Sequence, residues 1–159
     1  MSDANEPAGP GGAAPDEIDT AVWTLLRLSR MIERAQTELT VPQYRVLRLV
    51  GAGEESSARV AERLSVRRPT LTAAADGLVA SGYLAREPDP SDRRVVRLCL
   101  TPSGGEVLDR TNAALRERLG EVLSGLPAPD RLFALLGEVG DALDARRAAR
   151  EAESMAGRR

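Results

Sequence analysis

The sequence predicts a mainly α-helical fold with one small β-hairpin. Apolar residues recur at spacings of three or four through six segments, which is the period of an α-helix. Only residues 83–100 show the alternating pattern of strands. Hydrophobic residues make up 42% of the 159 residues but aromatic residues only 3%, so Leu, Val and Ala must build the core. That composition favours helices, and the length suits one core of ordinary size.

The N-terminus, "MSDANEPAGPGGAAPDE", is acidic and rich in Gly and Pro. It lacks the basic and apolar regions of a signal peptide, so we expect residues 1–15 to be a disordered tail. No run approaches the roughly 20 apolar residues that span a bilayer. These features predict a cytoplasmic protein that has no membrane partner.

Several kinds of chemistry are excluded by composition. The chain has no His and a single Cys, Cys99, so neither an internal disulfide nor a zinc site can form. No nucleophile–base pair or phosphate-binding loop is present. We therefore expect that the protein is not an enzyme and needs no cofactor or metal.

The first helix is expected over residues 16–38, where Ile18, Val22 and Leu25 lie on one face. In the following "TVPQYRVLRLV", Thr40 and Gln43 have the spacing of a capping box, and Pro42 falls in the first helical turn. Gly51 and Gly53 are expected to end this second helix.

Two short helices come next. Ser56 or Ser57 can cap the third, "SARVAERLS", and the fourth extends from Pro69 to Ser81, where Gly82 follows. Two short helices joined by a tight turn are typical of a helix-turn-helix.

The hairpin consists of "YLAREP", a "DPSD" loop and "VVRLCL". Alternation places Val96, Leu98 and Leu100 on one face of the second strand and the intervening residues on the other. Thr101 or Ser103 can cap the next helix, expected over residues 104–126, and a last helix is expected over 130–149. We expect residues 150–159 to be a frayed tail.

A hairpin placed after a helix-turn-helix predicts a winged helix, in which the second helix enters the major groove of DNA and the loop reaches the minor groove. The chain carries a net charge of -2, and every basic residue is Arg. Residues 56–97 hold eight Arg and five acids, so this segment is +3 while the remainder is -5. A local basic patch suited to DNA is therefore present.

From Ile18 to Val139 the sequence resembles the MarR family of winged-helix transcription regulators. "LTVPQYRVLRLV" is similar to the family's second helix, and "VAERLSVRRPTLTAAADGLVASGYLARE" to its helix-turn-helix. "DPSDRRVVRLCLTPSG" resembles its wing, with the Asp-x-Arg motif. The resemblance implies residues 16–39 and 102–149 as dimerisation helices and residues 40–101 as the DNA-binding domain.

The resemblance also implies which residues bind double-stranded DNA. On the wing, Asp92 would brace an arginine, Arg94 occupies the motif position and Arg93 extends the basic tip. Ala73 and Gly77 depart from the family where relatives often carry polar groups, so base reading by this helix is expected to be modest. The other expected contacts surround the recognition helix: Ser57, Arg67, Arg68, Pro69, Thr70 and Thr72.

A ligand site is implied as well, for a small aromatic or anionic molecule between the dimer helices and the DNA-binding lobe. Trp23, Arg27, Met31 and Tyr44 are candidates for its lining, although for each of them a packing role in the core or on the surface is favoured. Cys99 lies away from the first helix, where redox-sensing relatives carry their cysteine, so redox sensing is disfavoured.

The sequence thus predicts a homodimeric, sequence-specific DNA-binding regulator of a pseudo-palindromic operator, acting as a repressor that a ligand releases. The alternative is an architectural or weakly specific DNA-binding protein, which the Ala-rich recognition helix keeps open.

Overall fold

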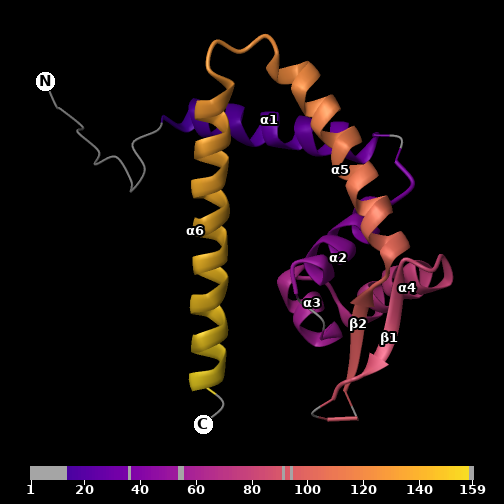
Figure 1. The fold of residues 1–159 in the computed structure, drawn as a ribbon. Coiled ribbons are helices and arrows are strands. Elements are labelled where there is room, and N and C mark those ends of the chain that lie inside the picture. The colour runs from indigo at the N-terminus through magenta and orange to yellow at the C-terminus, as the bar shows by residue number, and fades with distance from the viewer. Residues whose placement is uncertain (1–13, 36, 54–55, 91, 94, 158–159) are drawn as a thin grey trace, which may run out of the picture. The chain divides into compact units, whose positions relative to one another are not determined.

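The computed structural model describes residues 14–35, 37–53, 56–90, 92–93 and 95–157. Within these ranges it contains six helices and one two-stranded antiparallel sheet (Figure 1). Their bounds are α1 Pro15–Glu33, α2 Val41–Gly51, α3 Ser57–Arg63, α4 Arg68–Ala80, β1 Leu84–Pro88, β2 Val96–Leu100, α5 Pro102–Leu123 and α6 Pro129–Ala156. The chain forms two compact units, Met1–Arg118 and Leu119–Arg159. The mainly helical fold with one hairpin is confirmed.

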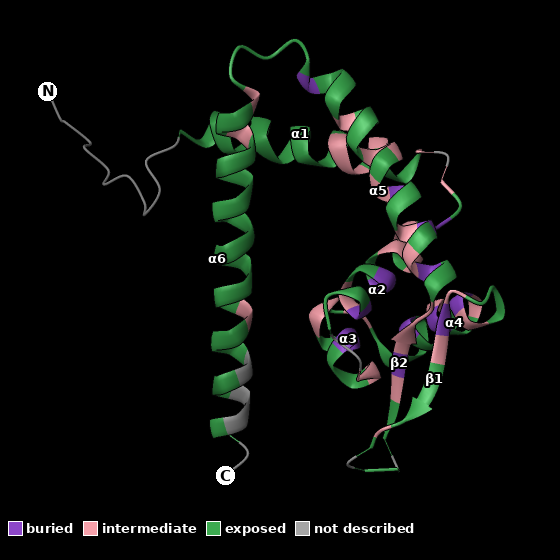
Figure 2. Cartoon of the chain, in the orientation of Figure 1, coloured by how far each residue is buried: buried purple, intermediate pink, exposed green. Residues whose placement is uncertain are grey.

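The core of the first unit lies among α2, α3, α4 and the hairpin, where Figure 2 shows the buried residues gathered. Leu47, Leu78 and Leu98 come from three different elements and are fully buried. Burial of such side chains contributes roughly 1.5–3 kcal/mol each, which holds the helix-turn-helix and the wing as one body. The core also contains Leu39, Val46, Val50, Val60, Ala61, Leu71, Ala75, Leu84 and Val107.

The expected capping box at the start of α2 is confirmed. The Thr40 hydroxyl accepts the Gln43 N–H at 3.4 Å, and the Gln43 side-chain oxygen accepts the Thr40 N–H at 3.0 Å. Pro42 lies in the first turn. Two backbone donors that a helix N-terminus leaves without intrahelical partners are thereby satisfied.

The turn of the helix-turn-helix follows α3 and depends on Ser65. The Val66 N–H bonds to the Ala61 carbonyl, while Ser65 takes the left-handed φ of 52°. Gly82 plays the same part after α4, with a φ of 73°, and the Tyr83 N–H reaches the Leu78 carbonyl. Both helices therefore end in a Schellman motif. Ser56 is the N-cap of α3 by backbone position, but its side chain makes no capping hydrogen bond.

In the hairpin, β1 pairs antiparallel with β2 from Leu84↔Leu100 to Pro88↔Val96. Leu98 is buried as expected, and Leu100 packs against the core. Val96 was expected on the buried face but is 47% exposed, because the hairpin extends beyond the core at this end. The hairpin leads directly into α5. The Thr101 hydroxyl caps that helix by accepting the Gly104 N–H at 3.0 Å.

The ends of α1 and α6 show the largest differences from expectation, while α5 ends at Leu123, three residues before its expected end. α1 ends at Glu33 rather than near residue 38, since the Thr37 hydroxyl bonds to the Leu39 carbonyl and the chain turns so that Leu39 enters the core. α6 continues to Ala156, seven residues beyond its expected end. Its final turns are rich in Ala, Arg and Glu, which have high helix propensity.

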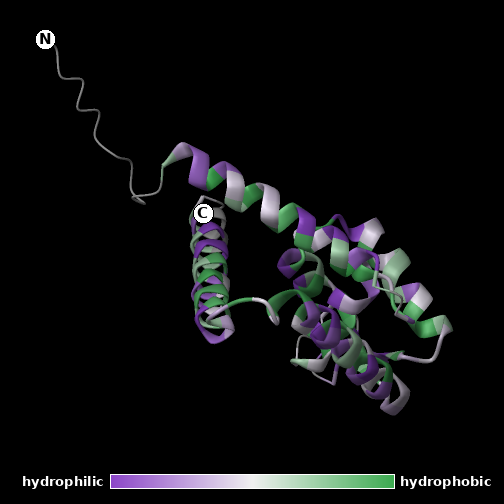
Figure 3. Ribbon diagram, turned by 90° about the horizontal axis from the view of Figure 1, so that it is seen from above, coloured by the Kyte–Doolittle hydropathy of each residue, from purple (hydrophilic) through white to green (hydrophobic). Residues whose placement is uncertain are grey.

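The terminal helices α1 and α6 carry apolar side chains in solvent. Figure 3 shows polar and apolar residues alternating around α1, and none of its residues is buried. Trp23 is 64% exposed on α1 and Leu143 is 62% exposed on α6. Among the described residues, no helix combines the length and the apolar character needed to cross a membrane.

Candidate nucleic-acid interface

The N-terminal end of α4 presents two exposed arginines. Arg67 is the N-cap residue and Arg68 begins the helix, with Pro69 and Thr70 in the first turn, all on the surface. A helix N-terminus carries a partial positive charge, so the backbone adds to the guanidinium groups there. The positions expected for DNA contact on α4 therefore lie together at one accessible end.

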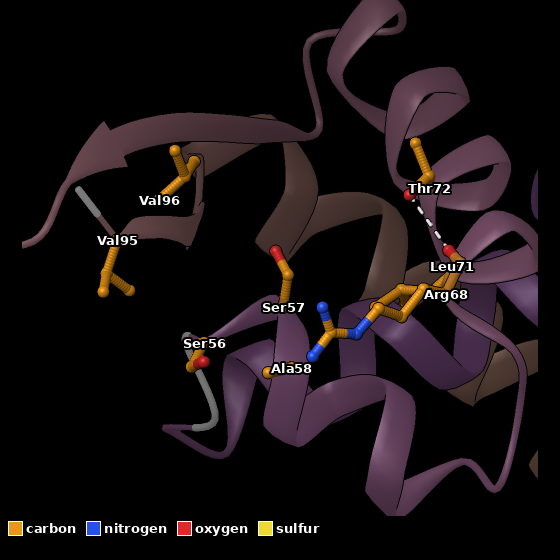
Figure 4. Close-up of a pocket in the computed structure, with 8 residues that line it drawn as sticks. All are labelled: Ser56, Ser57, Ala58, Arg68, Leu71, Thr72, Val95 and Val96. Carbon is orange, nitrogen blue, oxygen red and sulfur yellow. Dashed lines mark hydrogen bonds between the residues drawn. The ribbon is translucent and has the colours of Figure 1, made fainter.

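A groove of about 380 Å³ separates this end of α4 from the wing (Figure 4). Arg68 extends from α4 toward Ala58 and Ser57 at the start of α3. The Thr72 hydroxyl donates to the Arg68 carbonyl at 2.9 Å, which leaves its oxygen lone pairs able to accept. The whole lining is Ser56, Ser57, Ala58, Arg68, Leu71, Thr72, Val95 and Val96.

The wing loop is organised by Asp89. Its carboxylate accepts the Asp92 N–H at 3.2 Å and lies 3.8 Å from the Nε of Arg97 on β2. The Val95 N–H bonds to the Asp92 carbonyl, and Arg93 is exposed in the turn between them. The expected partner of Asp92, Arg94, lies outside the described residues. Asp89 was not among the predicted residues, although its spacing of three from Asp92 is typical of an Asp in a turn.

A second ion pair fixes the wing against the recognition helix. Arg86 of β1 lies 2.6 Å from the Asp76 carboxylate on α4, and both side chains are exposed. Asp76 is the acid of α4, so this pair neutralises a negative charge that would otherwise repel phosphate. This pair could not be predicted from the sequence, because ten residues and a turn separate its partners.

The exposed surface of α4 carries little polar chemistry. Ala73 is exposed, and its methyl group can neither donate nor accept a hydrogen bond. Gly77 instead lies against α2, where a Cβ would approach the Gln43 side-chain nitrogen at 3.2 Å. A Cβ at this position would require the Gln43 amide to move by a few tenths of an ångström.

The four residues expected around a ligand are only partly brought together. Arg27 and Met31 of α1 line a second pocket, of about 400 Å³, together with Arg30, Arg34 and Arg118. Trp23 is not part of this lining. The Tyr44 hydroxyl donates to Asn112 on α5 at 2.9 Å, so it connects α2 with α5.

Cys99 has the properties of a packing residue. Partial burial raises the pKa of its thiol, and the neighbouring Glu87 carboxylate raises this pKa further, whereas Arg97 lowers it by a smaller amount. The thiolate is the reactive form, so this environment suppresses its reactivity.

Comparison with known proteins identifies the family. A family model described as MarR family matches residues 37–95, from the segment before α2 to the wing. The regulator PecS of Dickeya dadantii is 31% identical over 130 residues, which cover 74% of this chain and 78% of that protein. The chain belongs to the MarR family. YkoM of Bacillus subtilis, an uncharacterised helix-turn-helix regulator, is 33% identical over 62% of this chain and 66% of its own length.

Solved structures share the MarR-family fold. The repressor CouR bound to a 23-mer DNA duplex aligns with a TM-score of 0.68 and 27% identity, covering 84% of this chain and 99% of that one. BldR of Sulfolobus solfataricus aligns with a TM-score of 0.67 and 26% identity, covering 79% and 94%. The predicted winged helix-turn-helix is confirmed, and the protein is a DNA-binding transcriptional regulator and not an enzyme.

Proposed function

We propose that this MarR-family protein is a homodimeric, sequence-specific repressor that a small molecule releases from DNA. The dimer is supported by the exposed apolar side chains of α1 and, independently, by those of α6. Ile18, Val22 and Leu25 of α1 are more than half exposed. On α6 the exposed apolar residues are Phe133, Leu135, Leu136, Val139 and Leu143.

A second copy is the occupant that best suits these surfaces. Burial of apolar surface stabilises a complex by about 25 cal/mol per Å². Both helices expose several large apolar side chains that a partner could cover. A two-fold interface would bury the same residues on both copies. Residues 16–39 and 102–149 would then form the dimerisation region, leaving residues 40–101 to bind DNA.

In such a dimer each protomer presents one α4 and one wing. Arg67, Arg68 and Thr70 at the start of α4 would contact phosphates and base edges in the major groove, with Ser57 and Thr72 at the rim of the groove beside it. Arg93 and Arg94 of the wing would enter the minor groove, whose negative potential attracts arginine. Two-fold symmetry then implies a pseudo-palindromic operator with half-sites roughly 34 Å apart.

The ligand part of the proposal is supported by CouR. This repressor from Rhodococcus jostii is seen in one structure with DNA and in another with p-coumaroyl-CoA. Here Arg27 and Met31 already share a pocket at the end of α1. A ligand that binds the DNA-free arrangement more tightly would lower the affinity for DNA by linkage.

The test uses the full-length protein and DNA from the region upstream of its own gene. We expect a dimer by light scattering and operator binding that falls steeply with salt, since phosphate contacts release counterions. Arg94→Ala should weaken binding strongly without altering the dimer, while Arg45→Ala on the exposed side of α2 should not. Normal binding by Arg94→Ala would show that the wing assignment is wrong.

The same assay separates the alternative function. A specific regulator should bind its operator at least about 10³-fold more tightly than unrelated DNA. A ratio near one would instead indicate an architectural or weakly specific DNA-binding protein, which the poorly polar surface of α4 would explain. A reporter placed behind the operator should be silenced by the protein, and activation would contradict the repressor assignment.

A further inference from the structure

The second pocket is surrounded by arginines. Arg27, Arg30 and Arg34 follow one another along α1 at spacings of three and four, so they project from one face of the helix. Arg118 of α5 and the thioether of Met31 complete the lining of this space of about 400 Å³. Four guanidinium groups therefore border a single cavity large enough for a small molecule.

Three arginines along α1 lack acidic partners among the described residues, whereas two arginines elsewhere in the fold have them. Arg86 is paired with Asp76, and Arg110 with Glu38. Among the described residues, no carboxylate lies within 4.0 Å of the guanidinium nitrogens of Arg27, Arg30 or Arg34. Like charges around one pocket repel one another, so an anion that binds among them lowers the free energy of the arrangement.

We propose that this pocket binds a small polyanion, a molecule with at least two anionic groups such as a pyrophosphate ester or a polycarboxylate. Guanidinium groups present paired donors that match phosphate and carboxylate oxygens. A single carboxylate would offset only one of the three charges of Arg27, Arg30 and Arg34, and the lining contains no aromatic ring to bind the remainder of an aromatic acid. This inference deepens the proposed function by naming the ligand class, and the binding step can be tested without DNA.

The experiment measures binding to the full-length protein by titration calorimetry at constant ionic strength. The probes are inorganic pyrophosphate, citrate, orthophosphate and benzoate. We expect saturable binding of pyrophosphate or citrate, and binding of benzoate at least about tenfold weaker. The relative affinities of pyrophosphate and citrate distinguish a phosphate ligand from a polycarboxylate. Equal or tighter binding of benzoate would overturn the proposal.

Paired variants locate the site. Arg27→Gln with Arg30→Gln should raise the dissociation constant of the tighter probe at least about tenfold, because two charge-assisted contacts are lost. The control is Arg45→Gln with Arg48→Gln, two exposed arginines on α2 with the same spacing and charge change, which should stay within about twofold. If instead Arg67→Gln with Arg68→Gln abolishes binding and the α1 pair does not, the anion binds at the DNA surface and the proposal fails.

Two further measurements separate this inference from the proposed function. If the variant with Arg27→Gln and Arg30→Gln is a monomer where the wild type is a dimer, these arginines stabilise the subunit interface and the inference is wrong. Polyanion binding that depends on Arg27 and Arg30 supports it even if operator DNA is not released, in which case only the ligand-release part of the proposed function fails. Release of DNA by benzoate without polyanion binding would support the ligand-release part of the proposed function and overturn this inference.

Discussion

Arg110 of α5 donates two hydrogen bonds to the Glu38 carboxylate, from its Nε at 2.7 Å and from a terminal nitrogen at 3.2 Å. The Tyr83 hydroxyl donates to the same carboxylate at 3.4 Å. Three segments thereby meet at one side chain: the loop before α2, the turn after α4 and the long helix α5. The contact connects the DNA-binding elements to the first part of α5.

The first prediction concerns the pH dependence of this contact. The hydrogen bonds from Arg110 lower the pKa of Glu38 below its ordinary value of 4.5. A carboxyl whose pKa is lowered on folding stabilises the protein above its unfolded pKa, and this contribution is lost as the pH falls through the folded pKa. Glu38→Gln should therefore lower the melting temperature at neutral pH, and the difference from wild type should shrink as the pH falls below 4.5 and vanish below the lowered pKa of Glu38.

The control for Glu38 is Glu117→Gln, an exposed glutamate of α5 without an ion partner among the described residues. Its melting temperature should follow that of the wild type at every pH. A Glu38 variant that behaves in the same way would show that the ion pair contributes nothing to stability.

The second prediction concerns the junction of the wing and α5. A Cβ at Gly104 would lie 2.0 Å from the Tyr83 carbonyl oxygen, a backbone atom that cannot move aside. We expect Gly104→Ala to cost about 3 kcal/mol or more by overpacking. Gly105→Ala has open space around its Cβ and should instead stabilise by about 0.5–1 kcal/mol. Urea unfolding at fixed protein concentration measures both, and equal effects would contradict the close approach.

The third prediction concerns the turn of the helix-turn-helix. Ser65 is exposed with a φ of 52°, a conformation that costs a non-glycine residue roughly 1–2 kcal/mol. Ser65→Gly should therefore stabilise by about 0.5–1 kcal/mol in thermal unfolding, after the greater freedom of glycine in the unfolded chain is subtracted. Ser81 is the C-cap of α4 with a φ of -82°, so Ser81→Gly should destabilise. Destabilisation by both changes would refute the left-handed assignment of Ser65.

The fourth prediction concerns Cys99. Because burial and Glu87 raise the pKa of its thiol, alkylation by iodoacetamide at neutral pH should be slower than that of free cysteine. Cys99→Ser should bind operator DNA with the wild-type affinity, with or without peroxide. Peroxide-dependent release in the wild type alone would establish the redox role that the sequence disfavours.

Local patterns identified the parts of the fold correctly. The capping box of Thr40 and Gln43, the cap of α5 at Thr101 and the glycine after α4 each involve residues close in sequence. Such interactions depend on backbone geometry within a few residues, so the residue types themselves suffice to predict them. The alternating strand of the hairpin is predictable for the same reason.

Contacts between distant segments could not be predicted in this way. Seventy-two positions separate Glu38 from Arg110. In the sequence, nothing distinguishes Arg30 and Arg34 from other polar helix positions. The packing of α1 near Arg118 places them around one pocket with Arg27. Likewise, the early end of α1 follows from the burial of Leu39 in a core formed by other elements.

The sequence by itself determined the order of helices and strands, the basic segment around the wing and the family, because short-range periodicity, capping and motif spacing express these features directly. The tertiary structure alone decided which charges meet. Asp76 with Arg86, Asp89 with Arg97 and Glu38 with Arg110 are pairs across the fold, whereas the arginines of α1 remain without acids among the described residues. Charge interactions depend on distance in space, and folding sets that distance only after the core has formed.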